Sequence, residues 1–361
     1  MRITGRSGIG LRGVVIAALL LVILVVTLTP SGKGSPAPFS FALTLGRRGL
    51  ADVLLNFLLF LPLGLTIGWN SRSPLVAGLC GLLLATAVEL VQTIVPGRDP
   101  SLSDIISNTA GTLAGALIAR RPRAWLIPSG NGSVALTASS IFAAALLMIA
   151  TAFLLSPVPA SPIWASKQFR LPASSANDPA DVRTLLAVES PSAEELIFIA
   201  RSGNDLLLRY PSRAGAFGLD QPEYWQRGAF KRSASRETDL LSLSRDRARW
   251  HIVIGSNRAT LGPTVGTGWA VLAYPDAIGR RWGEVLNAAW MFVICFPVGF
   301  WARGRLRLGA AVLVVVIVAF VPEISGVVDT SLLEWGGAVV GFLTGASIAA
   351  SSGRWLSHWV K

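Results

Sequence analysis

The stretch ADVLLNFLLFLPLGLTIGWN, residues 51–70, is apolar for almost its whole length and carries single polar side chains at Asp52 and Asn56 near its start. A helix needs about 20 mostly apolar residues to cross the hydrocarbon core of a bilayer. The stretch therefore predicts a transmembrane helix over residues 50–68, and we expect about eight such helices in the chain. The other segments of this kind lie at 13–30, 75–96, 104–119, 134–156, 284–302, 306–322 and 331–350.

The composition of the whole chain also indicates a membrane protein. Of its 361 residues, 52% are hydrophobic and only 14% are charged, a balance typical of polytopic membrane proteins. Its two cysteines, Cys80 and Cys295, lie in apolar segments, so neither a disulfide framework nor a cysteine metal site is predicted. The two histidines, His251 and His358, lie outside the predicted helices. We therefore expect no metal, no cofactor and no histidine chemistry inside the membrane.

The basic residues predict how the helices are oriented. With the N-terminus in the cytoplasm, the cytoplasmic loops are 1–12, 69–74, 120–133, 303–305 and 351–361. These loops contain arginine and lysine but no aspartate or glutamate, the pattern of the positive-inside rule. We therefore expect a multi-pass protein of the inner (plasma) membrane with both termini in the cytoplasm. The formal net charge of +12 lies mainly at helix ends, which argues against binding to nucleic acid.

The helices of the two halves share a pattern of small and polar residues. The matching positions are Pro62 with Pro297, Gly64 with Gly299, Glu89 with Glu323, Gly111 with Gly341 and Gly115 with Gly345. Both halves begin on the same side, so the pattern predicts a parallel repeat of four helices plus four, related by an axis along the membrane normal. Chance similarity between apolar helices is the alternative.

Residues 157–283 differ from the helical segments on either side. Short runs rich in Leu, Ile, Val and aromatic residues alternate with Gly, Pro, Asn and Ser, as in antiparallel β-structure. The expected strands are 184–188, 195–200, 205–210, 239–244, 250–254 and 269–274. We therefore expect an inserted extracytoplasmic β-sandwich, which resembles concanavalin-like or laminin-G-like sandwiches. Its aromatic residues fit a buried core better than a glycan-binding face. They are Tyr210, Tyr224, Trp225, Trp250 and Trp269.

The sequence thus predicts an all-α polytopic bundle interrupted by a β-domain. The expected regions are a first helical region at 13–120, a fifth helix at 134–156, the β-sandwich at 157–283 and a second helical region at 284–350. The segment 13–30 is followed by Pro30 and Ser31 instead of a small-residue cleavage site, so we expect a retained helix and not a cleaved signal peptide.

Polar residues recur near the outer ends of the second, third and fourth predicted helices. The pairs are Asp52 with Asn56, Glu89 with Gln92, and Asp104 with Asn108. Because their members are three or four residues apart, each pair lies on one face of its helix. A carboxylate facing lipid is costly, so these side chains should face one another, with Arg98 of the intervening loop available to pair with Glu89 or Asp104. Both a packing clamp and a cavity for a polar or cationic headgroup fit this pattern.

The order and spacing of these residues resemble the VanZ-like family of membrane proteins. The resemblance rests on the stretches 52–64, 89–98 and 103–115 and covers about residues 14–120. The founding member of that family is associated with resistance to the glycopeptide teicoplanin. The resemblance therefore implies a place in the cell envelope, and it implies no particular reaction.

We expect an envelope accessory protein whose partners are membrane lipids and a cell-envelope glycan or lipid-linked precursor. One alternative is a transporter or flippase in which both helical halves line one path. Another is an envelope-lipid enzyme with Glu89 or Asp104 as a base and Arg98 on a phosphate. In the second half Gly326 and Ala338 stand where Gln92 and Asn108 would align, so that half is expected to be structural.

Overall fold

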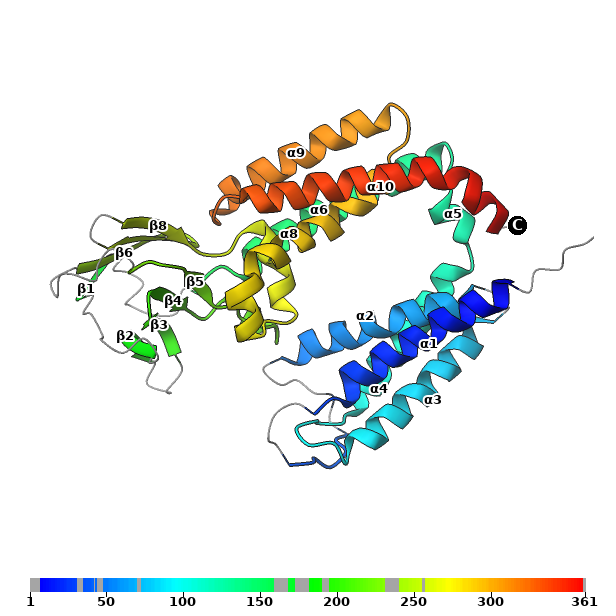
Figure 1. The fold of residues 1–361 in the computed structure, drawn as a ribbon, viewed down its shortest axis with the longest axis horizontal. Coiled ribbons are helices and arrows are strands. Elements are labelled where there is room, and N and C mark those ends of the chain that lie inside the picture. The colour runs from blue at the N-terminus through cyan, green and yellow to red at the C-terminus, as the bar shows by residue number, and fades with distance from the viewer. Residues whose placement is uncertain are drawn as a thin grey trace, which may run out of the picture. The chain divides into compact units, whose positions relative to one another are not determined.

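The computed structural model describes residues 7–30, 35–41, 43, 48–69, 73–158, 168–172, 182–189, 195–230, 240–254 and 257–359. Four basic residues of the predicted cytoplasmic loops, Arg2, Arg6, Arg72 and Lys361, lie outside these ranges. The chain divides into two compact units. Unit 1 contains Met1–Pro128 with Leu356–Lys361, and unit 2 contains Ser129–Trp355 (Figure 1).

Unit 1 is a helical bundle. Its helices are α1 (Ser7–Leu28), α2 (Gly49–Gly68), α3 (Pro74–Gln92), α4 (Leu102–Ala119) and the short α5 (Pro122–Leu126). α2 packs along α4, and α3 packs against both. A small apolar core joins α1, α2 and α3 through Ile23, Phe60 and Ala85. The main contact in unit 1 is therefore the one between α2 and α4.

Glycine allows α2 and α4 to approach closely. A Cβ atom on Gly64 would overlap the main-chain carbonyl of Thr112, and a Cβ atom on Gly111 would overlap that of Phe57. Small residues at such positions let two membrane helices gain van der Waals contact along their backbones. The contact fixes the start of α2 beside the start of α4, which is where the polar residues lie.

Unit 2 combines helices with the inserted β-structure. Its membrane-type helices are α6 (Asn131–Leu154), α8 (Asp276–Trp301), α9 (Leu306–Ser325) and α10 (Leu332–Trp359). Their core includes Met148, Met291 and Val318. Glycine again allows two helices to approach closely. A Cβ atom on Gly299 of α8 would overlap the carbonyl of Phe342 in α10. α8 begins at Asp276, inside the range 157–283 that the sequence assigned to the inserted domain.

Six helices among the described residues are long and apolar enough to cross a membrane, namely α2, α3, α6, residues Ile278–Trp301 of α8, α9, and residues Leu332–Ser351 of α10. α1 contributes a shorter apolar stretch, Gly13–Leu28. α4 forms where the segment 104–119 was predicted, but it is not among the six. Its first half carries Ser103, Asp104, Ser107 and Asn108, which lower its hydropathy.

The inserted region forms two four-stranded antiparallel sheets, ordered β1-β6-β7-β8 and β2-β3-β4-β5. The strands are β1 (Gln168–Pro172), β2 (Val182–Glu189), β3 (Glu195–Ser202), β4 (Asp205–Arg209), β5 (Tyr224–Gln226), β6 (Leu240–Asp246), β7 (Arg249–Ile254) and β8 (Asn257–Leu261), with the single helical turn α7 (Arg213–Ala216) between β4 and β5. Side chains of both sheets share one hydrophobic cluster, which includes Ile199, Leu208, Leu243 and Trp250.

Five of the six predicted strands coincide with β2, β3, β4, β6 and β7, and the prediction of a strand over 269–274 is wrong. The first half of that stretch, residues 269–271, belongs to the 3-10 helix η2 (Val265–Val271). Thr264 and Thr267 form a capping box at its start, which favours a helical turn over an extended chain. The apolar residues of η2 also pack against α6 and α8 instead of a neighbouring strand.

Most of the singled-out aromatic residues of the β-region are buried. Trp250 is fully buried, and Tyr210 and Tyr224 stack on each other with ring centroids 5.3 Å apart. Burial raises the pKa of both tyrosine hydroxyls above the usual range. Trp225 and Trp269 are only partly buried. Trp269 stacks on Tyr274 and donates to Asn287 Oδ1 of α8 at 2.8 Å.

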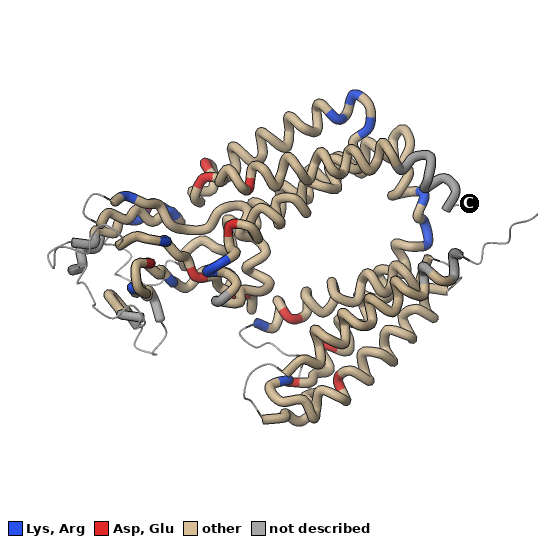
Figure 2. Tube along the Cα trace, viewed as in Figure 1, with Lys and Arg blue, Asp and Glu red and all other residues tan. Residues whose placement is uncertain are grey.

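Basic and acidic residues lie at opposite ends of α9 (Figure 2). Arg303, Arg305 and Arg307 lie in and after the connection from α8 to α9, whereas Glu323 and Asp329 lie at and beyond the other end of α9. At that end, Arg249 of β7 makes ion pairs with Glu323 at 3.2 Å and with Asp329 at 3.0 Å. The β-region is thus attached to the acidic end of the helices.

Candidate functional site

Polar side chains from three helices meet at one end of unit 1. We use the term polar cluster for Asp52, Asn56, Glu89, Gln92, Arg98, Asp104 and Asn108. Asn56 of α2 donates to Asp104 Oδ1 of α4 at 2.6 Å. Asp52 and Glu89 each lie within electrostatic range of the Asp104 carboxylate. The structure therefore brings the carboxylates of α2, α3 and α4 together, with Asp104 in the middle.

Glu89 is the most deeply buried acid of this cluster, with 2% of its surface exposed. Its Oε2 accepts a hydrogen bond from the main-chain N–H of Ser101 at 2.9 Å. Ser101 is the N-cap of α4, and its hydroxyl accepts from the N–H of Asp104 at 3.2 Å. Since the first N–H groups of a helix lack partners within the helix, the α3 carboxylate and the serine together cap α4.

Arg98 does not make the predicted ion pair with Glu89 or Asp104. Its guanidinium donates to the main-chain carbonyls of Thr29, at 2.9 and 2.6 Å, and of Val26, at 2.6 Å. The last carbonyls of α1 lack partners within that helix, and the planar guanidinium has donors enough to reach both. Arg98 therefore donates to these carbonyls and not to the carboxylates of Glu89 and Asp104, which already accept hydrogen bonds from neutral donors.

Gln92 acts in a similar way on the same helix. It is 6% exposed, and its side-chain amide donates to the carbonyl of Thr27 at 2.8 Å. Gln92 and Arg98 therefore attach the end of α3 and the following loop to the end of α1. The rest of the polar cluster consists of Asp52, which is exposed, the partly buried Asn56 and Asp104, and the buried Glu89 and Asn108.

Asn108 lies one helical turn after Asp104 and is 1% exposed. Its Oδ1 is buried and accepts no hydrogen bond from any residue that the structure describes. Residues i and i+4 of a helix share a face, so Asn108 lies on the same face of α4 as Asp104. A buried polar atom without a partner costs free energy, which makes Asn108 a position that a ligand donor would satisfy.

Sequence reasoning missed Ser101 and Ser40. Ser40 donates its N–H to the Pro100 carbonyl at 2.9 Å and accepts from the Leu102 N–H at 3.0 Å, which fixes the loop before α4. The motif Ser101-x-x-Asp104 immediately before an apolar helix was the available signal for the cap. No local pattern marks Ser40, because its partners are distant in sequence. Within the described residues, no group of three or more His, Cys, Asp or Glu side chains is placed to hold a metal ion.

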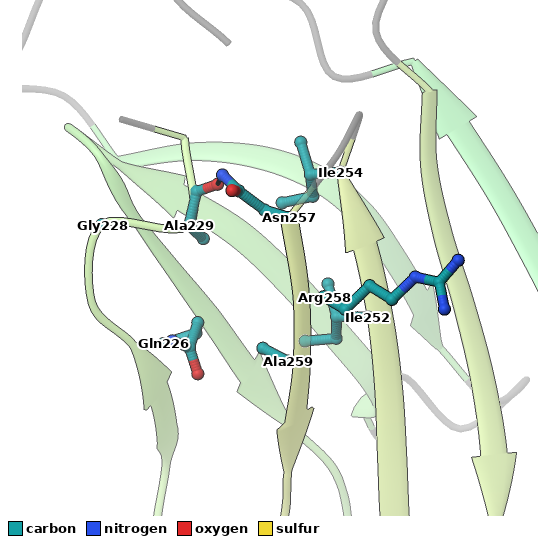
Figure 3. Close-up of a pocket in the computed structure, with 8 residues that line it drawn as sticks. All are labelled: Gln226, Gly228, Ala229, Ile252, Ile254, Asn257, Arg258 and Ala259. Atoms are coloured by element: carbon teal, nitrogen blue, oxygen red, sulfur yellow. Dashed lines mark hydrogen bonds between the residues drawn. The ribbon is translucent and has the colours of Figure 1, made fainter. Parts of the chain in front are cut away.

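The β-region contains a small cavity of about 320 Å³. Its lining comes from β7, β8 and the residues after β5, and it includes Gln226, Ala229, Ile252 and Asn257. In Figure 3 the Asn257 side chain points toward Ala229, whose carbonyl accepts its amide at 3.2 Å, and the Arg258 side chain extends away from Gln226 and Ala229. The lining thus mixes the polar residues Gln226, Asn257 and Arg258 with apolar ones, and it does not indicate one class of ligand.

Part of the chain matches a known protein family. Residues 14–126 match the family model described as VanZ/LLP1, which confirms the resemblance seen in the sequence. Neither the curated proteins nor the solved structures contain a match to the chain. The matched region contains the entire polar cluster and extends from within α1 to the last residue of α5.

Proposed function

We propose, for this multi-pass membrane protein with a VanZ-like region at residues 14–126, an accessory role in the cell envelope. In this role the polar cluster of unit 1 binds the headgroup of an envelope lipid or of a lipid-linked glycan. Lipid contact by the apolar helices is expected from their composition alone. The headgroup site is the specific part of the proposal.

One observation carries the proposal, namely that the carboxylates at the centre of the cluster are held by neutral donors. Glu89 accepts from a main-chain N–H, and Asp104 accepts from the amide of Asn56. Among the described residues, neither acid makes an ion pair. Acids near a helix end lie at the depth of lipid headgroups. Asp104, which is partly exposed, is thus available to accept a hydrogen bond from a ligand that enters from the membrane surface, whereas Glu89 is buried.

We place the polar cluster and the β-region on the outer side of the inner membrane, with both termini in the cytoplasm. The arginines at the start of α9 and the acids beyond its other end support this orientation. On this proposal α1 and α4 also cross the membrane, which gives eight spans in total. Their packing along α2 supports this count.

We also propose that the two sheets form a β-sandwich and that the helices form a parallel repeat of four plus four. The hydrophobic cluster shared by both sheets supports the sandwich. The glycine contacts support the repeat, because Gly64 faces the carbonyl of Thr112 just as Gly299 faces that of Phe342. Gly111 and Gly341 correspond in the same way, facing the carbonyls of Phe57 and Phe292.

The enzyme alternative receives less support from the geometry. It requires Arg98 to bind a phosphate, but the Arg98 guanidinium already donates to carbonyls at the end of α1. The transporter alternative requires both helical halves to line one path. In unit 2 the corresponding acid, Glu334, is fully buried and bound by side chains of its own chain, so it contributes no open path.

The test is complementation of cells that lack this protein, with sensitivity to the glycopeptide teicoplanin as the readout. Wild type and a Glu284→Gln control, changed at an exposed acid of α8, should restore the resistance of the parent strain. Asp104→Asn should fail to restore it while reaching the same amount in the membrane. Full restoration by Asp104→Asn, or no effect of losing the protein, would count against the proposed role.

A further inference from the structure

Asp104 and Glu334 occupy the same local position in their units. Each is the third residue of a helix that follows a serine, and each main-chain N–H donates to that serine hydroxyl. The distances are 3.2 Å from Asp104 to Ser101 and 3.3 Å from Glu334 to Ser331. About two turns later, each helix carries a glycine that faces the backbone of the neighbouring helix. The two acids can therefore be compared directly.

The carboxylate oxygens of Glu334 accept their hydrogen bonds from groups of the chain itself. The hydroxyl of Thr264 donates to Glu334 Oε1, and the N–H of Ser331 donates to Oε2 at 2.8 Å. Gly266 of η2 lies so close that a Cβ atom there would overlap the carboxylate. As a result, Glu334 is 0% exposed. The occupant of this position is a neutral hydroxyl on a segment that covers the acid.

Asp104 lacks such a cover in the part of unit 1 that the structure describes. The cap N–H that Glu334 binds in unit 2 is bound in unit 1 by Glu89, so the Asp104 carboxylate is not needed for that bond. Asp104 receives the amide of Asn56 and the hydroxyl of its own cap, Ser101. Part of its surface remains exposed.

The residue one turn after each acid also differs between the two units. After Glu334 this position is Ala338, which is 1% exposed and needs no hydrogen bond. After Asp104 it is Asn108, whose buried Oδ1 has no partner among the described residues. The unit with the uncovered acid thus also carries the unsatisfied acceptor. A donor from outside the described chain would satisfy Asn108 Oδ1, and the partly exposed Asp104 carboxylate can accept a further hydrogen bond beside those it already has.

We infer that Asp104 is the docking point for a hydroxyl group of the ligand, bound as Glu334 binds Thr264, and that the ligand is an uncharged, hydroxyl-rich lipid headgroup such as a glycosyl group. This inference rests on the proposed function and deepens it by naming the headgroup chemistry. A sugar supplies several donors, which suit the carboxylate of Asp104 and the neutral acceptor of Asn108. An anionic headgroup would be repelled by Asp52, Glu89 and Asp104.

The experiment uses the full chain in nanodiscs of phosphatidylcholine, whose headgroup has no hydrogen-bond donor. Monoglucosyl diacylglycerol is added as the probe, phosphatidylethanolamine serves as an ammonium-bearing comparison, and bound lipid is counted by native mass spectrometry. Wild type should retain the glucosyl lipid in preference to phosphatidylethanolamine. Asp104→Asn should weaken this retention about tenfold, and the control Glu284→Gln should not change it.

Asn108→Ala gives a second test that does not depend on the stability of Asp104→Asn. Removing an unsatisfied acceptor should leave the melting temperature in pure phosphatidylcholine unchanged or higher. The same change should weaken retention of the glucosyl lipid several-fold, because the ligand loses an acceptor. A substitution with a structural effect alone would lower the melting temperature and leave the lipid preference unchanged, which would contradict the inference.

The remaining outcomes separate the inference from the proposed function. If phosphatidylethanolamine is retained through Asp104 and the glucosyl lipid is not, the hydroxyl inference is wrong and headgroup binding at the polar cluster stands. If retention of neither lipid depends on Asp104, the inference and the proposed headgroup site both fail.

Discussion

The carboxylate of Glu89 in α3 accepts the main-chain N–H of Ser101, the N-cap of α4, at 2.9 Å. An acid at the end of one helix therefore completes the cap of the next helix. Such a bond satisfies a donor that α4 cannot satisfy itself. It also places a negative group at the helix N-terminus, where the helix dipole favours it.

Removing this cap should destabilise unit 1. We expect Glu89→Ala to lower the free energy of unfolding by about 1–3 kcal/mol, since it leaves the buried N–H of Ser101 without a partner. Glu89→Gln keeps an acceptor oxygen and should cost clearly less. Thermal melts in detergent measure both, with Glu284→Ala at an exposed site of α8 as the control. Equal losses for the alanine and glutamine variants would contradict the assigned hydrogen bond.

Arg98 should stabilise the protein through its hydrogen bonds to α1 and not through ion pairs with Glu89 or Asp104. We expect Arg98→Ala to destabilise the protein by about 1–2 kcal/mol through the loss of its bonds to the Val26 and Thr29 carbonyls. The double variants with Glu89→Gln and with Asp104→Asn should show additive losses within about 0.5 kcal/mol. Recovery of stability in either double variant would reveal an ion pair that the geometry does not contain.

Gly336 and Gly337 are neighbours in α10 with different surroundings. A Cβ atom on Gly337 would overlap the Ala288 carbonyl, whereas one on Gly336 would meet nothing within 4 Å. Gly337→Ala should therefore cost about 1–3 kcal/mol. Gly336→Ala should be neutral or stabilise by up to about 1 kcal/mol through better helix propensity. Thermal melts of the two variants provide the comparison, and similar melting temperatures would show that α8 and α10 do not approach this closely.

The orientation in the membrane can be tested by cysteine labelling. In a background without Cys80 and Cys295, single cysteines replace Ser129 before α6 and Asn204 in the exposed turn between β3 and β4. An impermeant thiol reagent should label the cysteine at 204 in intact cells and the one at 129 only after lysis. The reverse pattern would place the β-region in the cytoplasm.

Periodicity and length were enough to predict where the helices lie. Long apolar runs leave the chain few alternatives in a bilayer, because every backbone group must be satisfied internally. The strands with strong apolar content, such as β3 and β7, were also predicted. β8 was not, since Asn257–Leu261 is short and largely polar. Its place depends on pairing with β7, which no local pattern reveals.

The residues of the polar cluster were singled out from the sequence, and their contacts were predicted only in part. Helical spacing correctly placed the acids of α2, α3 and α4 at one end of the bundle. The partner of Arg98 was wrong, because a sequence shows side-chain charges and does not show which main-chain carbonyls lack partners. The link between Ser40 and the start of α4 was invisible for the same reason.

The strand order of the β-region has a consequence for biosynthesis. The sheet β2-β3-β4-β5 pairs consecutive strands, so it can form once the chain has been synthesised as far as residue 226. Among the described strands β1 pairs with β6, through contacts such as Gln168 with Ser244, and must wait for the chain between them. During synthesis, the first strand therefore remains an unpaired edge until β6 has been made.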